Sequence, residues 1–171
     1  AIGAVTAGGT LTMRDSRVTH ITSGDTASVL AHGDVTIQRS TIARLVESGH
    51  DVTLSAFSLC EQSVPRHLPQ EVLASELAAA ARVFGLGEEK ILTFRYAVRT
   101  FPEHRQELLD ELLRIRGALK PEIVLMPAHA DTHQDHATIA AEGFRAFKDC
   151  TLLGYEMPWN NLSFTTTAFS I

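Results

Sequence analysis

The chain has 171 residues and a formal net charge of −5, and 44% of its residues are hydrophobic while 20% are charged. This length suits one well-buried domain, and the composition is typical of a globular protein rather than a disordered, collagen-like or coiled-coil one. The 15 Lys and Arg residues are scattered, so we expect no nucleic-acid partner. No apolar run reaches the roughly 18 residues needed to cross a bilayer, so we expect a soluble protein without a membrane span.

The two cysteines, Cys60 and Cys150, lie far apart and form no CxxC pattern. They are too few for a disulfide scaffold and wrongly spaced for a thiolate zinc site. The sequence therefore predicts a reducing, cytoplasmic location, and it is compatible with a homo-oligomer.

From about residue 41 the predicted elements alternate between helix and strand. Apolar spacing, with glycines or prolines at the ends, predicts helices over 41–49, 69–84 and 102–120, and apolar runs predict strands over 51–57, 91–94 and 123–127. The run at Ile123–Met126 is typical of a parallel strand buried on both faces, so we expect it at the centre of a sheet. The fold class is therefore α/β with a doubly wound sheet.

Each predicted helix has one apolar face. We expect these buried faces to consist of Ile42, Leu45 and Val46 in the first helix, of Val72, Leu73, Leu77, Ala80, Ala81 and Phe84 in the second, and of Leu108, Leu109, Leu112, Leu113 and Ile115 in the third.

The first forty residues admit several interpretations. Residues 11–18 and 35–42 share a pattern of apolar and polar positions, as in coils of a β-helix, but two copies cannot bury a solenoid core. A second alignment relates residues 9–21 to residues 40–54. A repeat, chance similarity and an altered N-terminus all stay open.

Polar side chains are concentrated directly after the strand predicted at 123–127. Three of the eight histidines and two aspartates fall within residues 129–136. Because ligands bind at the carboxyl ends of strands in open α/β sheets, this position favours a functional site over a merely solvated polar turn. In the spacing His133-x-Asp135-His136, one imidazole can hold a metal ion while the other faces a substrate.

A second cluster, His32 and Asp34, follows a candidate first strand at 27–31. This order would bring both side chains to the same sheet edge as His133 and His136. Two histidines and one aspartate are ligands suited to zinc with an open water position. Taken alone, His32 would be a structurally neutral loop residue.

These motifs resemble the LmbE-like (PIG-L-like) family of zinc-dependent N-acetylglucosamine deacetylases. The resemblance runs through residues 40–53, 59–61, 127–147 and 154–161, and it covers about three-quarters of the chain. It implies a Rossmann-like, mostly parallel sheet with helices on both faces. It also implies hydrolysis of an acetamide on a small-molecule amino sugar or a related conjugate.

The resemblance assigns the N-terminal cluster residue by residue. Where the family carries Ala-His-Pro-Asp-Asp-Glu, this chain reads Ala31-His-Gly-Asp-Val-Thr36. His32 matches a zinc ligand and Asp34 matches the general base, whereas Val35 occupies the position of the second ligand. We therefore expect one LmbE-like domain over residues 1–171, with residues 1–30 atypical and the C-terminal end truncated.

The resemblance gives the remaining residues their roles. His32 and His136 are the expected zinc ligands, and Asp34 is the third ligand or the base. His133, protonated and oriented by Asp135, would stabilise the oxyanion or protonate the leaving amine.

Three further points stay open in the sequence. Trp159 and Asn160 are expected to line a sugar pocket, although an aromatic residue after proline is equally a packing anchor. His129 and Asp131 would either complete the metal shell or belong to a polar turn. The alternative to an enzyme is a non-catalytic or crippled domain of the same fold that is used for binding or assembly.

Overall fold

Helices and parallel strands alternate along the chain, as the sequence predicts. The computed structural model describes residues 26–28, 41–155, 160, 161 and 163. Its elements in chain order are β1 (Thr26–Ser28), α1 (Thr41–Glu47), β2 (Asp51–Val52), β3 (Leu54–Ala56), α2 (Val72–Val83), β4 (Ile91–Thr93), α3 (Arg105–Leu119), β5 (Ile123–Pro127), α4 (Gln134–Ala146) and β6 (Thr151–Tyr155). A 3₁₀ turn at Phe101–His104 leads directly into α3.

The strands form two small parallel sheets. One has the order β2-β1-β5-β6, and the other consists of β3 and β4. β5 has parallel partners on both sides, and Val124, Leu125, Met126 and Pro127 are buried. This confirms the prediction of a central strand at Ile123–Met126, and it confirms the α/β class.

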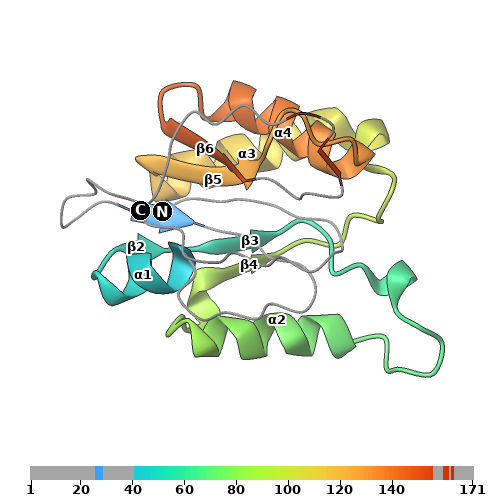
Figure 1. Ribbon diagram of the computed structural model, residues 1–171. Helices are drawn as coiled ribbons and strands as arrows, with labels where there is room; N and C mark the ends of the chain where they lie inside the picture. Colours follow the sequence, from blue (N-terminus) through green and yellow to red (C-terminus); the bar gives the residue numbers. More distant parts are fainter. Residues whose placement is uncertain (1–25, 29–40, 156–159, 162, 164–171) are drawn as a thin grey trace.

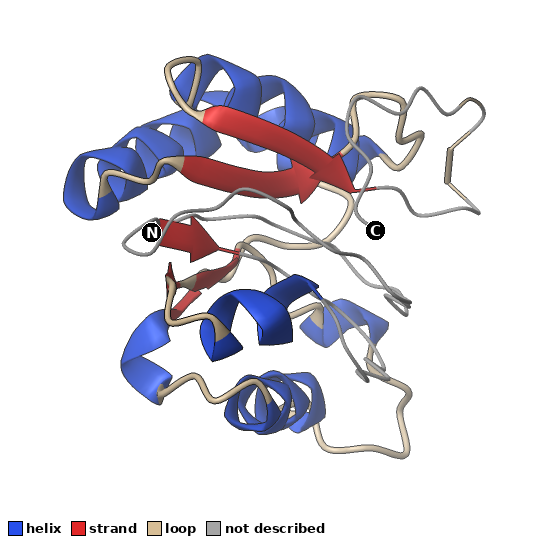
Figure 2. Ribbon diagram, turned by 60° about the vertical axis from the view of Figure 1, so that its left-hand side comes forward, coloured by secondary structure: helices blue, strands red, loops and turns tan. Residues whose placement is uncertain are grey.

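The helices lie on two sides of the strands. Figure 1 shows α3 and α4 beside β5 and β6, while α1 and α2 lie beside β2, β3 and β4. Figure 2 shows the same separation from another direction. Phe57, Phe101 and Phe147 are each 0% exposed, so aromatic side chains fill the core from both halves of the chain.

Two predicted apolar faces differ in detail from the structure. In α3, Leu113 is 42% exposed whereas Leu112 is 1% exposed, because adjacent helical positions point about 100° apart. In α2, only Ala81 is fully buried, and Leu77 and Ala80 pack against the core while partly exposed. The helix assignments are thus confirmed, but the buried stripes are narrower than expected.

Glycines mark one predicted end and one close approach. Gly49 has φ +83° and its N–H donates to Val46 O at 2.9 Å, so it ends α1 as predicted. Our sequence analysis did not predict β6. There, a Cβ on Gly154 would lie 3.2 Å from Ala128 Cα, which is a tight contact, so glycine favours the close approach of the strand to the turn after β5.

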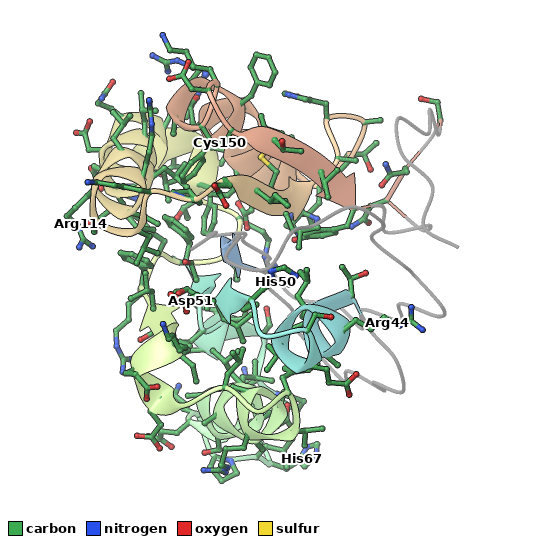
Figure 3. The ribbon with its side chains drawn as sticks, turned by 90° about the vertical axis from the view of Figure 1, so that its left-hand side faces the viewer. Arg44, His50, Asp51, His67, Arg114 and Cys150 are labelled. Atoms are coloured by element: carbon green, nitrogen blue, oxygen red, sulfur yellow. The ribbon has the colours of Figure 1, made fainter. Side chains whose placement is uncertain are left out.

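The two cysteines are not joined by a disulfide. The Cys150 thiol, labelled in Figure 3, donates to Pro121 O at 3.1 Å, and burial raises its pKa. Among the helices that the structure describes, none is long and apolar enough to cross a membrane. Of the first forty residues the structure describes only β1, so the first copies of both repeat interpretations, residues 11–18 and 9–21, lie outside the described residues.

Leu112 and Leu113 provide a matched test of the α3 packing. We expect Leu112→Ala to lower the free energy of unfolding by about 2–5 kcal/mol, because it opens a cavity in the core. Leu113→Ala should cost less than about 1 kcal/mol, because its side chain is exposed. Urea unfolding of both variants measures the difference. Equal losses in the free energy of unfolding would contradict the observed orientation of α3, in which Leu112 faces the core and Leu113 does not.

Candidate active site

The histidine-rich turn connects the carboxyl end of β5 to the first turn of α4. His133 is the N-cap residue of α4, and its Nδ1 accepts a hydrogen bond from the Asp135 backbone N–H at 3.2 Å. An N-cap side chain satisfies a backbone donor that the helix itself leaves unpaired. The helix start therefore fixes the position of the His133 ring.

A buried hydrogen-bonded pair of side chains lies behind this cap. Asp131 Oδ2 is 2.8 Å from His136 Nδ1, and both side chains are 0% exposed. Asp131 Oδ1 also accepts the His133 backbone N–H at 2.8 Å. When Nδ1–H donates to a carboxylate, Nε2 carries the lone pair, which is the arrangement typical of a metal-ligating histidine.

The two imidazoles of His133 and His136 stack on each other. Their ring centroids are 4.5 Å apart with an interplanar angle of 29°. Burial, followed by the neighbouring His136 and Arg99, lowers the pKa of His133, although Asp135 and Asp131 oppose the shift. Because Nδ1 accepts a hydrogen bond, the structure favours a neutral His133 with its proton on Nε2.

The carboxylate of Asp135 has a different partner from the one we expected. It is 0% exposed and accepts the backbone N–H of Arg99 at 2.5 Å and of Phe101 at 3.2 Å. His133 is thus held by the backbone of Asp135 rather than by its carboxylate. The carboxylate instead binds the backbone of a loop that lies 36 residues earlier in the sequence.

The loop at Arg99 is fastened to α4 at several points. Arg99 itself has φ +70°, in the left-handed region, and the Gln134 side chain donates to its carbonyl oxygen. Further along α4, the fully buried carboxylate of Glu142 forms ion pairs with Arg105 at 2.5 Å and with Arg145 at 2.6 Å. Buried polar contacts therefore hold the 99–105 segment in a single position against α4.

A second segment pairs with the histidine-rich turn. The backbone N–H and the hydroxyl of Thr132 donate to Asn160 O at 2.9 Å and 2.7 Å. Asp131 and Asn161 form an isolated antiparallel bridge. Asn160, which we expected to bind a sugar, thus lies next to the turn, and its described contacts are made by its backbone.

The predicted site residues are only partly visible in the structure. His133, Asp135 and His136 come together at the start of α4, and Asp131 joins them. His32, Asp34, Val35 and Trp159 lie outside the described residues. Within the described ranges, no group of three or more His, Cys, Asp or Glu side chains could hold a metal ion.

Sequence reasoning understated two residues of this site. The sequence analysis considered Asp131 as a candidate for the metal shell or a polar turn, but not as the partner of His136. The two residues lie five positions apart, on either side of the N-cap residue of α4. Arg99 carried no sequence signal at all, because its tie to the site is a backbone contact distant in sequence.

Comparison with known proteins identifies the family. The profile described as PIG-L: GlcNAc-PI de-N-acetylase matches residues 27–147, which is most of the chain. The chain belongs to the PIG-L family. None of the curated proteins compared with this PIG-L chain matches it.

Two solved structures are similar to this PIG-L chain. An N,N'-diacetylchitobiose deacetylase from Pyrococcus horikoshii, complexed with an inhibitor, is 21% identical with a TM-score of 0.51, over 62% of this chain and 42% of that chain. A conserved protein from Thermus thermophilus is 24% identical with a TM-score of 0.48, over 67% of this chain and 52% of that chain. The matched region spans about half the length of these proteins or less, and the first likeness shows a shared fold.

The role of Asp135 as an anchor is testable. Asp135→Ala would leave the buried N–H of Phe101 and the N–H of Arg99 without their acceptor, so we expect a loss of about 3 kcal/mol in the free energy of unfolding. Asp110→Ala is the control, because Asp110 accepts a hydrogen bond from Gln106 on the exposed side of α3. For Asp110→Ala, the free energy of unfolding should fall by less than about 1 kcal/mol.

Chemical denaturation of the two variants measures these losses. If Asp135→Ala is no less stable than Asp110→Ala, the carboxylate does not hold the loop.

Proposed function

We propose that this PIG-L chain is a zinc-dependent hydrolase that removes an acetyl group from an N-acetylated amino sugar or sugar conjugate. The observation that carries the proposal is the buried Asp131–His136 pair at the carboxyl end of β5. Membership of the PIG-L family supports the deacetylase type of reaction. The substrate is a small molecule, and the proposed location is the cytoplasm.

The described residues fit one ligand of the proposed zinc ion. His136, with its Nδ1 on Asp131, has the tautomer and the orientation that a ligating imidazole needs. His32 is proposed as a second ligand, and Asp34 is proposed either as the third ligand or as the base, because one carboxylate cannot easily do both. Zinc would lower the pKa of a water molecule and polarise the acetyl carbonyl.

The side chains around the ligand have separate tasks in this proposal. As the base, Asp34 would accept a proton from the attacking water at its carboxylate. His133, neutral with its proton on Nε2, donates a hydrogen bond to the oxyanion that forms from the acetyl carbonyl. Asp135 is a positioning residue, because its backbone N–H holds the His133 ring and its carboxylate holds the Arg99 loop.

The Rossmann-like, doubly wound sheet belongs to the same proposal. Only Thr53 separates β2 from β3, so the two small sheets would join into one with the order β4-β3/β2-β1-β5-β6. The strand order then reverses between β1 and β5, which is where ligands bind in such folds. Because β1 and β5 are parallel neighbours, their carboxyl ends point to the same edge of the sheet, where the histidine-rich turn lies.

Trp159 and Asn160 are the proposed sugar-binding residues. The carbonyl oxygen of Asn160 accepts two hydrogen bonds from Thr132, and these contacts beside His133 support the proposal. The indole ring of Trp159, which follows Pro158, would stack on the face of the bound sugar.

A non-catalytic PIG-L domain is the second candidate function. It is favoured by Val35, which stands where the family has its second ligand, an aspartate. Metal analysis separates the two candidates, since stoichiometric zinc in the purified protein favours the enzyme. Absence of zinc after reconstitution favours a binding or assembly domain.

Substitution of His136 and of His133 should have different effects on zinc content and turnover. We expect His136→Ala to lower zinc occupancy, because it removes a ligand. His133→Ala should keep the zinc and lower turnover about 10²-fold or more, because it removes a donor to the transition state. Metal content by mass spectrometry and acetate release measure the two effects, and equal zinc in wild type and His136→Ala would remove His136 from the site.

Val35→Asp tests the ligand count. An open catalytic zinc site normally has three protein ligands, while Asp34 is also wanted as the base. The new carboxylate should therefore increase the thermal stabilisation that zinc gives over chelator. The same zinc-induced shift in wild type and Val35→Asp would mean that residues 32–35 do not face His136.

A further inference from the structure

Arg99 has a backbone conformation that an arginine rarely adopts. Its φ of +70° lies in the left-handed region, where a residue with a Cβ is strained. The conformation is held from two sides, because the backbone N–H donates to the buried Asp135 carboxylate at 2.5 Å and the carbonyl oxygen accepts from the Gln134 side chain. Strain of this kind persists where surrounding contacts enforce it, and it is concentrated at functional sites. These contacts fix the direction in which the Arg99 side chain leaves the backbone, beside the first turn of α4.

The Arg99 side chain differs from those of the other arginines between residues 91 and 155. Each of the others forms an ion pair with a carboxylate, namely Arg95, Arg105, Arg114, Arg116 and Arg145. Among the described residues, the Arg99 guanidinium has no such partner, and the residue is exposed. An anion from solution can therefore reach it without a cavity or any opening of the fold.

The acidic side chains of α4 and of the turn before it are already engaged. Asp131 binds His136, Asp135 accepts two backbone N–H groups, and Glu142 pairs with two other arginines. All three carboxylates are fully buried or nearly so. The described part of this region thus supplies Arg99 with no counter-ion, and a negative charge has to come from a bound molecule.

Arg99 also lies next to the proposed reaction site. The helix turn that His133 caps is the turn whose residues 134 and 135 hold the Arg99 backbone. Burial is the main cause of the lowered pKa of His133, and the charges of His136 and Arg99 add to it. A group bound by Arg99 would therefore lie beside the imidazole that faces the acetyl carbonyl in the proposed function.

We propose that Arg99 is a specificity-determining residue, which binds an anionic group, a phosphate or a carboxylate, carried by the acetylated sugar. The sugar class rests on the proposed function, whereas the anion-binding role rests on the contacts of Arg99. A guanidinium has five N–H donors and no acceptor, and its planar fork matches two oxygens of a carboxylate or phosphate. A neutral hydroxyl group offers a single uncharged oxygen, so it binds this fork more weakly.

A stability measurement separates binding from folding. Glycine adopts a φ of +70° without steric cost, so we expect the unfolding midpoint of Arg99→Gly to lie within about 4 °C of wild type or above it. A larger fall would show that the guanidinium stabilises the fold through a partner in the chain. That result would overturn the proposal.

A binding series tests the anion directly. N-acetylglucosamine, its 1-phosphate, its 6-phosphate and its 6-carboxylate analogue are titrated calorimetrically into the metal-free chain. The neutral chelator 1,10-phenanthroline removes metal, so that neither zinc nor an anionic chelator competes for the ligand. We expect wild type to bind at least one anionic sugar about tenfold more tightly than the neutral one. Arg99→Gln should lose about tenfold on that sugar and less than about twofold on neutral N-acetylglucosamine.

Arg82→Gln is the matched control for net charge. Arg82 is an exposed arginine in the last turn of α2, and it also lacks an ion pair among the described residues. Figure 1 shows α2 on the other side of the strands from α4. We expect Arg82→Gln to bind all four sugars as wild type does, and an equal loss in both variants would reduce the effect to net charge and overturn the proposal. The sugar that loses most in Arg99→Gln distinguishes phosphate from carboxylate.

The outcomes separate this inference from the proposed function. Equal affinity of wild type for neutral and anionic sugars, equal affinity of wild type and Arg99→Gln for the anionic ones, or no binding at all overturns the role of Arg99. Acetate release by the zinc-loaded wild type is measured in parallel. If acetate is not released but anionic sugars are preferred through Arg99, the hydrolase proposal fails and the anion contact stands.

Discussion

The carboxylate of Asp131 is the group on which the geometry of this site depends. It sits in the turn after β5 and is fully buried, yet it contacts His136 through one oxygen and the backbone of His133 through the other. A buried carboxylate costs several kcal/mol unless such partners satisfy it. The cost of burying Asp131 therefore enforces a single arrangement of the turn, of the helix cap and, through the bridge to Asn161, of the following segment.

The second constraint is the tie between α4 and the loop before α3. Asp135 accepts two backbone N–H groups there, and Glu142, about two turns further along α4, binds Arg105. A negative charge in the first turn of α4 is also favoured by the helix dipole. These contacts stabilise Arg99 in a left-handed conformation that would otherwise be strained, beside the stacked imidazoles.

The sequence predicted the parts of this protein that depend on local pattern. The apolar run at Ile123–Met126 predicted a central strand, and the apolar spacing in α3 predicted a helix. Both patterns are local because burial of an element determines which of its positions are apolar. Contacts distant in sequence left no such signal. The bonds from Asp135 to Arg99 and Phe101 span 36 and 34 positions, and no periodicity links a carboxylate to a backbone N–H. The width of the buried face of α2 was likewise not predictable, because it depends on which elements pack against the helix.

The contrast between Asp131 and Asp135 shows why motif spacing alone does not tell which atoms of an aspartate contact a nearby histidine. Both aspartates are buried, and both are close in sequence to His133. The N-cap geometry points the Asp135 backbone N–H at the ring, so its carboxylate is directed away toward the Arg99 loop. Asp131 comes before the cap and reaches across it to His136. The hydrogen bond to Asp131 thereby fixes the orientation of the buried His136 ring within the fold.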